Sequence, residues 1–131
     1  VRLCRAVLPA MAKAKFGRVL FIQTSYTIGC PPKNTAAYVM AKSAIGGLVK
    51  SLAVEYAKFG VTVNCVAPSM METNFLKDTP DLIVQAAAAD NPMGRNARPG
   101  DVVPAMAFLL SEEAGFITGV TLPITGGSAI V

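Results

Sequence analysis

The chain has 131 residues, of which 53% are hydrophobic and 15% are charged, and its formal net charge is +4. That length suits one domain and hardly two, and the scattered basic residues form no stripe of the kind that binds nucleic acid. There is no histidine, which excludes a histidine-based triad and histidine metal ligands, and no apolar run reaches the ~18 residues that span a bilayer.

The first half of the chain alternates between helical and strand patterns. Residues 1–15 carry apolar side chains at a helical period, although Pro9 predicts a kink or an end in that helix. Residues 18–23 form a short continuous apolar run, which is typical of a parallel strand buried on both faces. After a loop, residues 35–58 predict a long helix that ends at Gly60.

The second half continues the alternation. Residues 61–67 predict a second strand, which Pro68 ends. Residues 69–91 are expected to form a mobile flap that contains a helix at 81–90. A further helix is expected over 101–111, and residues 119–124 predict a third strand. This order predicts an α/β fold with a parallel sheet, with about three strands and four to five helices.

Tyr38 and Lys42 stand four residues apart in the expected long helix, so both project from one face. A nearby positive charge favours the phenolate, which would suit Tyr38 to general acid–base catalysis. Taken alone, the spacing favours a core aromatic beside a solvated lysine, because such a motif arises easily by chance.

Other polar residues are expected near this pair. In a parallel α/β sheet, ligands bind beyond the carboxyl ends of the strands. Thr24 and Ser25 leave the first strand there, and residues 68–73 leave the second. The Ser25 hydroxyl would donate to a carbonyl oxygen at which Tyr38 exchanges a proton. None of these groups transfers a hydride, so the chemistry requires a nicotinamide cofactor.

The ordered motifs resemble the C-terminal half of a short-chain dehydrogenase/reductase, and their pattern is most similar to 3-oxoacyl-(acyl-carrier-protein) reductases. The motifs are Thr24-Ser25, Tyr38-x-x-x-Lys42, Asn64-x-Val66-x-Pro68, Glu72-Thr73, Arg95 with Asp101, Ile117-Thr118-Gly119 and Gly126-Gly127. The resemblance implies that residues 1–131 are the C-terminal catalytic half of one Rossmann-like, doubly wound domain, without its N-terminal cofactor-binding half.

The resemblance also implies roles for individual residues. Ser25, Tyr38 and Lys42 would be catalytic, and no metal is implied. The nicotinamide end of NADP or NAD would be bound by Tyr38, Lys42, Pro68, Ser69, Met71 and Thr73. Ser69 departs from the family pattern, which has glycine after the proline, and its side chain narrows the approach of the backbone to the cofactor.

The function expected from this resemblance is NAD(P)-dependent interconversion of a carbonyl and a secondary alcohol. The leading substrate is a 3-oxoacyl thioester on an acyl carrier, as in fatty acid biosynthesis. The alternatives are a sugar or polyol intermediate, or a non-catalytic half-domain that acts as an interaction scaffold. Three widely spaced cysteines suit reduced thiols in the cytoplasm. The apolar surplus predicts a homo-oligomer, a dimer or tetramer, with no nucleic acid or membrane partner.

Overall fold

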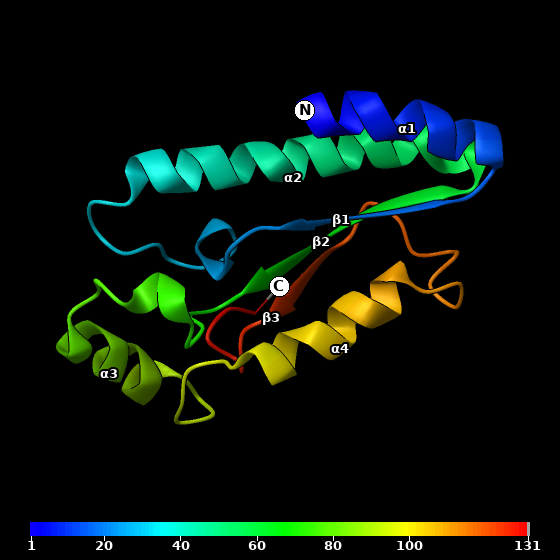
Figure 1. The fold of residues 1–131 in the computed structure, drawn as a ribbon. Coiled ribbons are helices and arrows are strands. Elements are labelled where there is room, and N and C mark those ends of the chain that lie inside the picture. The colour runs from blue at the N-terminus through cyan, green and yellow to red at the C-terminus, as the bar shows by residue number, and fades with distance from the viewer. Residues whose placement is uncertain (131) are drawn as a thin grey trace.

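A three-stranded parallel sheet forms the centre of the computed structural model, which describes residues 1–130 (Figure 1). The strands are β1 (Gly17–Ile22), β2 (Val61–Pro68) and β3 (Thr121–Ile124), and β2 lies in the middle. Both pairings are parallel, so the carboxyl ends of all three strands lie at one edge. The predicted α/β fold with a parallel sheet is confirmed.

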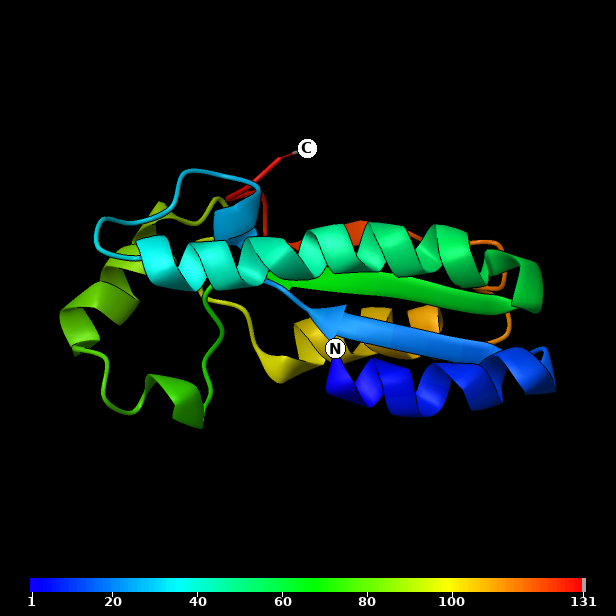
Figure 2. The same ribbon diagram turned by 90° about the horizontal axis from the view of Figure 1, so that it is seen from above.

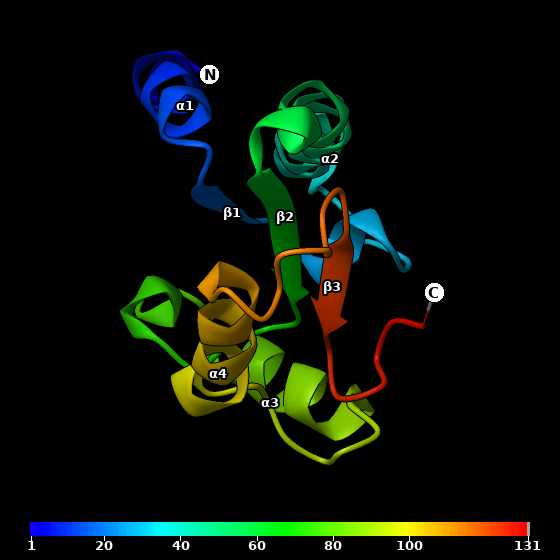
Figure 3. The same cartoon turned by 90° about the vertical axis from the view of Figure 1, so that its right-hand side faces the viewer.

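Helices cover both faces of this sheet. Helices α1 (Arg2–Ala14) and α2 (Ala36–Tyr56) lie on one face, and α4 (Pro99–Leu110) lies on the other (Figure 3). Viewed from above, α2 runs along β2 and α1 runs beside β1 (Figure 2). Helix α3 (Asp81–Asp90) lies beyond the carboxyl ends of the strands (Figure 1). Three short 3-10 turns complete the secondary structure: η1 (Ser25–Thr27), η2 (Ala57–Phe59) and η3 (Asn74–Leu76).

The core follows from the central position of β2, whose eight residues are all buried. Between the sheet and the first two helices, one apolar cluster includes Leu8, Val49 and Val63. A second cluster, which includes Val66 and Val102, lies between the sheet and α4. Apolar side chains on both faces therefore hold the sheet between the two helical layers.

Helix α2 carries the long apolar segment of the chain. Residues 36–59 are long and apolar enough to cross a membrane by length and composition alone. In the structure the helix packs against β2 through buried Val49 and Ala53. Gly60, in a left-handed conformation with φ of 72°, ends the helical segment as predicted.

Burial of β1 differs from the prediction. Its residues after Gly17 are only partly buried, and Ile22 is 48% exposed. The reason is that β1 is an edge strand of the described sheet and pairs on one side only. Strand β3 lies at the opposite edge of the sheet and contains Pro123. An edge strand accommodates proline, because the N–H groups on its outer side have no partner strand.

Three of the differences between the observed and the predicted ends of elements have a clear physical reason. Helix α1 continues through Pro9 to Ala14. Proline has no N–H, so the carbonyl four residues before Pro9 has no helical partner, but that carbonyl is on the exposed side of the helix. Helix α4 begins at Pro99, a favourable first position, and Asp101 acts within its first turn. Strand β3 begins only at Thr121, since Gly119 has φ of 79° and cannot continue a strand.

Candidate active site

A cavity of about 440 Å³ opens at the carboxyl edge of the sheet, between the first turns of α2 and the segment that follows β2. Its lining residues are Ile22, Gln23, Thr24, Tyr26, Tyr38, Lys42, Pro68, Ser69, Met70, Met71, Thr73, Phe75, Leu76 and Thr79. The structure thus brings together six of the seven residues predicted from the sequence. The seventh, Ser25, is not part of the lining.

Tyr38 and Lys42 share one wall of this cavity, as their helical spacing predicts. The Lys42 Nζ lies 5.9 Å from the centre of the Tyr38 ring, and it donates a hydrogen bond to the Ile22 carbonyl oxygen at 3.0 Å. This bond holds the ammonium at the end of β1. Tyr38 is 40% exposed, so its phenol is accessible to a molecule in the cavity.

Tyr26 is a second phenol beside Tyr38, and the sequence reasoning did not identify it. The two ring centres are 6.4 Å apart, with the ring planes at 75°. Burial, and secondarily the neighbouring Tyr38, raises the pKa of Tyr26. Tyr26 therefore remains a neutral phenol near pH 7, and Tyr38 is the more exposed of the two phenols.

Gln23 is another residue that sequence reasoning missed, although a polar side chain at the end of an apolar strand run was a visible signal. It is 6% exposed, and its backbone N–H extends the ladder to the Val66 carbonyl at 2.8 Å. Its Nε2 donates to the Lys42 carbonyl oxygen at 2.9 Å. Cys65 lies behind it, and burial raises the pKa of that thiol to about 11, so the thiol stays protonated.

The turn after β1 places two hydroxyl groups in different surroundings. Thr24 and Ser25 are 7% and 6% exposed, but only Thr24 lines the cavity. The Thr24 Oγ1 accepts a hydrogen bond from the Tyr26 N–H at 3.4 Å and so caps η1. Thr24 is also held through its carbonyl oxygen, which accepts from the Thr27 hydroxyl at 2.8 Å.

Pro68 and Ser69 form the floor where β2 ends. The Ser69 N–H donates to the Ile124 carbonyl at 3.1 Å, which ties this floor to the end of β3. The Ser69 Oγ is buried and has no hydrogen-bond partner among the described residues. A buried hydroxyl without a partner is unfavourable, so a bound molecule with a polar group would stabilise this position.

The expected flap is attached at its base. Met71 forms a parallel bridge with Ala97, in which the Glu72 N–H donates to the Ala97 carbonyl at 2.9 Å. Thr73 then caps η3 by accepting from the Phe75 N–H at 3.4 Å. Met71 and Thr73 are therefore held on the cavity wall, while the mobility of the rest of the flap remains a prediction.

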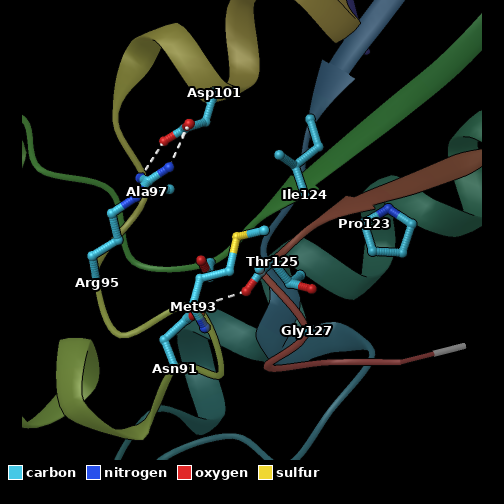
Figure 4. Close-up of a pocket in the computed structure, with 11 residues that line it drawn as sticks. Asn91, Met93, Arg95, Ala97, Asp101, Pro123, Ile124, Thr125 and Gly127 are labelled. Atoms are coloured by element: carbon cyan, nitrogen blue, oxygen red, sulfur yellow. Dashed lines mark hydrogen bonds and ion pairs between the residues drawn. The ribbon is translucent and has the colours of Figure 1, made fainter.

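A second cavity of about 400 Å³ lies between the Asn91–Ala97 loop and the end of β3 (Figure 4). Ser69 lines both cavities. Arg95 donates two hydrogen bonds to Asp101, at 2.7 and 2.9 Å, and this pairing holds the pKa of the aspartate well below its usual range. Asn91 donates to the Thr125 carbonyl at 2.9 Å. The pairing of Arg95 with Asp101 thus stabilises the Asn91–Ala97 loop.

Among residues 1–130 there is no group of three or more metal-ligating side chains. The walls of the first cavity instead offer a phenol, an ammonium, hydroxyl groups and apolar side chains. These groups suit hydrogen bonding and proton exchange at an oxygen of an organic molecule.

Comparison with known proteins gives a consistent match over nearly the whole chain. The family model described as Enoyl-(Acyl carrier protein) reductase matches residues 1–129. A 3-oxoacyl-(acyl-carrier-protein) reductase of Vibrio cholerae is 40% identical over 131 residues, covering 99% of this chain and 53% of the relative.

Solved structures agree with this match. A 3-oxoacyl-(acyl-carrier-protein) reductase of Agrobacterium tumefaciens with NADP bound is 34% identical, with a TM-score of 0.86 over 95% of this chain and 49% of its own. A reductase of the same description from Brucella melitensis, with NAD bound, is 29% identical and has a TM-score of 0.87 over 98% of this chain and 47% of its own. The chain therefore spans about half the length of the proteins it matches.

Proposed function

This chain belongs to the short-chain dehydrogenase/reductase family, and from that membership we propose that it is the C-terminal catalytic half of an NAD(P)-dependent oxidoreductase. The proposed reaction interconverts a carbonyl and a secondary alcohol. The observation that carries the proposal is the placement of Tyr38 and Lys42 on one wall of the cavity at the carboxyl edge of the sheet.

In the reductive direction, Tyr38 gives a proton to the oxygen of the substrate. Lys42 supports the tyrosine with its positive charge, and its remaining N–H groups are available to ribose hydroxyls. The Ser25 hydroxyl, in the turn after β1, donates a hydrogen bond to the same substrate oxygen. Together these groups stabilise the negative charge that develops on that oxygen in the transition state.

The cavity fits the nicotinamide end of NADP or NAD. Pro68, Ser69, Met71 and Thr73 line the wall opposite α2, and the unpartnered Ser69 hydroxyl offers a hydrogen bond to a polar group there. When bound, the nicotinamide supplies the hydride. We propose either cofactor, because a relative solved with NADP and a relative solved with NAD both match this chain.

A 3-oxoacyl thioester is the substrate we propose. The printed names of the relatives support it, and so do four apolar side chains on the flap side of the cavity, Met70, Met71, Phe75 and Leu76, which suit an acyl chain. A sugar or polyol would leave this apolar surface without contacts. We further propose a homo-oligomer, because Met40 and Val54 on α2 are 71% and 83% exposed. The free cysteines support the further proposal of a cytoplasmic location.

The test is a turnover assay of the complete protein that contains this chain. NADPH and NADH are each offered with a 3-oxoacyl thioester and, separately, with ketoses. Oxidation of either cofactor that depends on the thioester would support the proposal. Stereospecific reduction of ketoses alone would replace the substrate, and a folded protein that turns over no carbonyl compound with either cofactor would refute the function.

A further inference from the structure

The ring of Tyr26 lies beside the ring of Tyr38 in the candidate site, and the contact between the two residues is a contact of rings. We propose that Tyr26 is a positioning residue, whose ring holds the Tyr38 ring where its phenol reaches the substrate oxygen. This inference rests on the proposed function, in which Tyr38 exchanges the proton. In this role Tyr26 acts through Tyr38 and exchanges no proton itself.

Tyr38 requires such support because its place on the surface of α2 leaves it free to move. It lies in the first turn of the helix and is 40% exposed, and exposed side chains change rotamer rapidly. Proton exchange, in contrast, requires the phenol oxygen to lie within about 2.6–3.2 Å of its partner. Two groups lie beside the ring: the Lys42 ammonium, 5.9 Å from the ring centre, and the Tyr26 ring. The Tyr26 ring meets it with the planes at 75°, an edge-to-face arrangement that aromatic pairs prefer.

Tyr26 is itself held by the turn that carries it. Its N–H donates to the Thr24 Oγ1 at 3.4 Å, and this turn, η1, packs against α2. Three residues before Tyr26, the Gln23 side chain donates to the Lys42 carbonyl of the same helix at 2.9 Å. Hydrogen bonds therefore set the position of the Tyr26 ring relative to the part of α2 that carries Tyr38.

The Tyr26 ring is also uncharged near neutral pH. Burial, and secondarily the neighbouring Tyr38, raises the pKa of Tyr26, so Tyr26 keeps its proton. An ionised Tyr26 would repel a phenolate that forms on Tyr38 during turnover. The neutral ring provides contact surface without that repulsion, which is why the role belongs to the ring of Tyr26 and not to its hydroxyl.

The first experiment measures carbonyl reduction by variants of the complete protein. Tyr26→Leu removes the ring but keeps an apolar side chain, and we expect kcat to fall by roughly 10- to 100-fold without a comparable rise in KM, because a small displacement of a reacting group is costly. Tyr26→Phe keeps the ring and should recover most of that loss. Tyr56→Leu, which removes a tyrosine from the aromatic pair with Phe59 outside the cavity, is the control and should keep the wild-type kcat. Equal losses for Tyr26→Phe and Tyr26→Leu would overturn the proposal.

A second comparison tests whether Tyr26 acts through Tyr38. In a Tyr38→Phe background the proton-exchanging hydroxyl is already absent, so the addition of Tyr26→Leu should lower kcat by less than about twofold. A further loss as large as the one in the wild-type background would show that Tyr26 acts independently of Tyr38, and the positioning role would be wrong.

The third experiment tests the contact without turnover. Denaturant unfolding of the complete protein is measured for Tyr26→Leu, for Tyr38→Leu and for the double variant. The two effects on the unfolding equilibrium constant should depart from additivity by roughly 2- to 10-fold, as for other aromatic pairs. Additive effects would refute the contact. If the unaltered protein reduces no carbonyl compound, the proposed function fails, and the unfolding measurements still decide whether the Tyr26 ring supports Tyr38.

Discussion

The side-chain amide of Gln23 donates a hydrogen bond to the backbone carbonyl of Lys42 at 2.9 Å, which joins the end of β1 to the second turn of α2. In the opposite direction, the Lys42 ammonium donates to the carbonyl of Ile22 at 3.0 Å. Two bonds therefore fix this wall of the candidate site against the sheet. This arrangement explains how a helix with few buried residues holds its lysine in place.

The first prediction concerns the hydrogen bond from the Gln23 side chain to the Lys42 carbonyl. Gln23→Leu in the complete protein should lower the free energy of unfolding by about 1 kcal/mol and also lower kcat, because a buried amide bond is lost and Lys42 is less well positioned. Gln85→Leu, at an exposed position on α3, is the matched control and should change neither. Denaturant unfolding and steady-state kinetics measure both effects, and a stable variant with unaltered kcat would refute the positioning role.

The second prediction concerns Tyr38. Tyr38→Phe removes only the hydroxyl of a residue that is 40% exposed, so the fold should be retained. Turnover should fall by ~10²–10⁴-fold, the usual contribution of a general acid–base. Circular dichroism serves as the control for folding. A variant that keeps more than about a tenth of the wild-type kcat would show that another group exchanges the proton.

The third prediction concerns pH and the Arg95–Asp101 pair. Because Arg95 lowers the pKa of Asp101, the pair contributes stability above the ordinary aspartate pKa of about 3.9, and this stability is lost as the pH falls through the lower, folded-state value. Asp101→Asn should therefore lower Tm at pH 7, and the difference from the wild type should shrink in acid. Melting curves across pH test this, and a difference that grows in acid would contradict it.

The fourth prediction concerns assembly. Gly47 lies on α2 with open space around it, so Gly47→Arg fits the folded chain but places a charge on the exposed apolar side of the helix. We expect this variant of the complete protein to dissociate into smaller species in sedimentation. Gly100→Arg, at a similarly open position on α4, is the control and should not dissociate the protein. A wild-type protein that is monomeric at micromolar concentration would refute the oligomer.

The sequence by itself determined the features that depend on local periodicity. The alternation of apolar runs and helical patterns predicted the parallel α/β sheet and its strands to within a few residues. The four-residue spacing of Tyr38 and Lys42 predicted their common face, because neighbours on a helix follow from its pitch alone. The loops after the strands pointed to Pro68 and Ser69, since parallel strands end at one edge.

Only the tertiary structure decided the features that depend on contacts between distant segments. The bond from Gln23 to Lys42 joins residues nineteen positions apart, and no local pattern encodes it. The surroundings of Thr24, which lines the cavity, and of Ser25, which does not, depend on the residue at which the β1 ladder ends and η1 begins, and strand pairing sets that residue. A pattern read along the chain identifies residue types and spacing, but the position of a side chain in a cavity follows from how separate elements pack together.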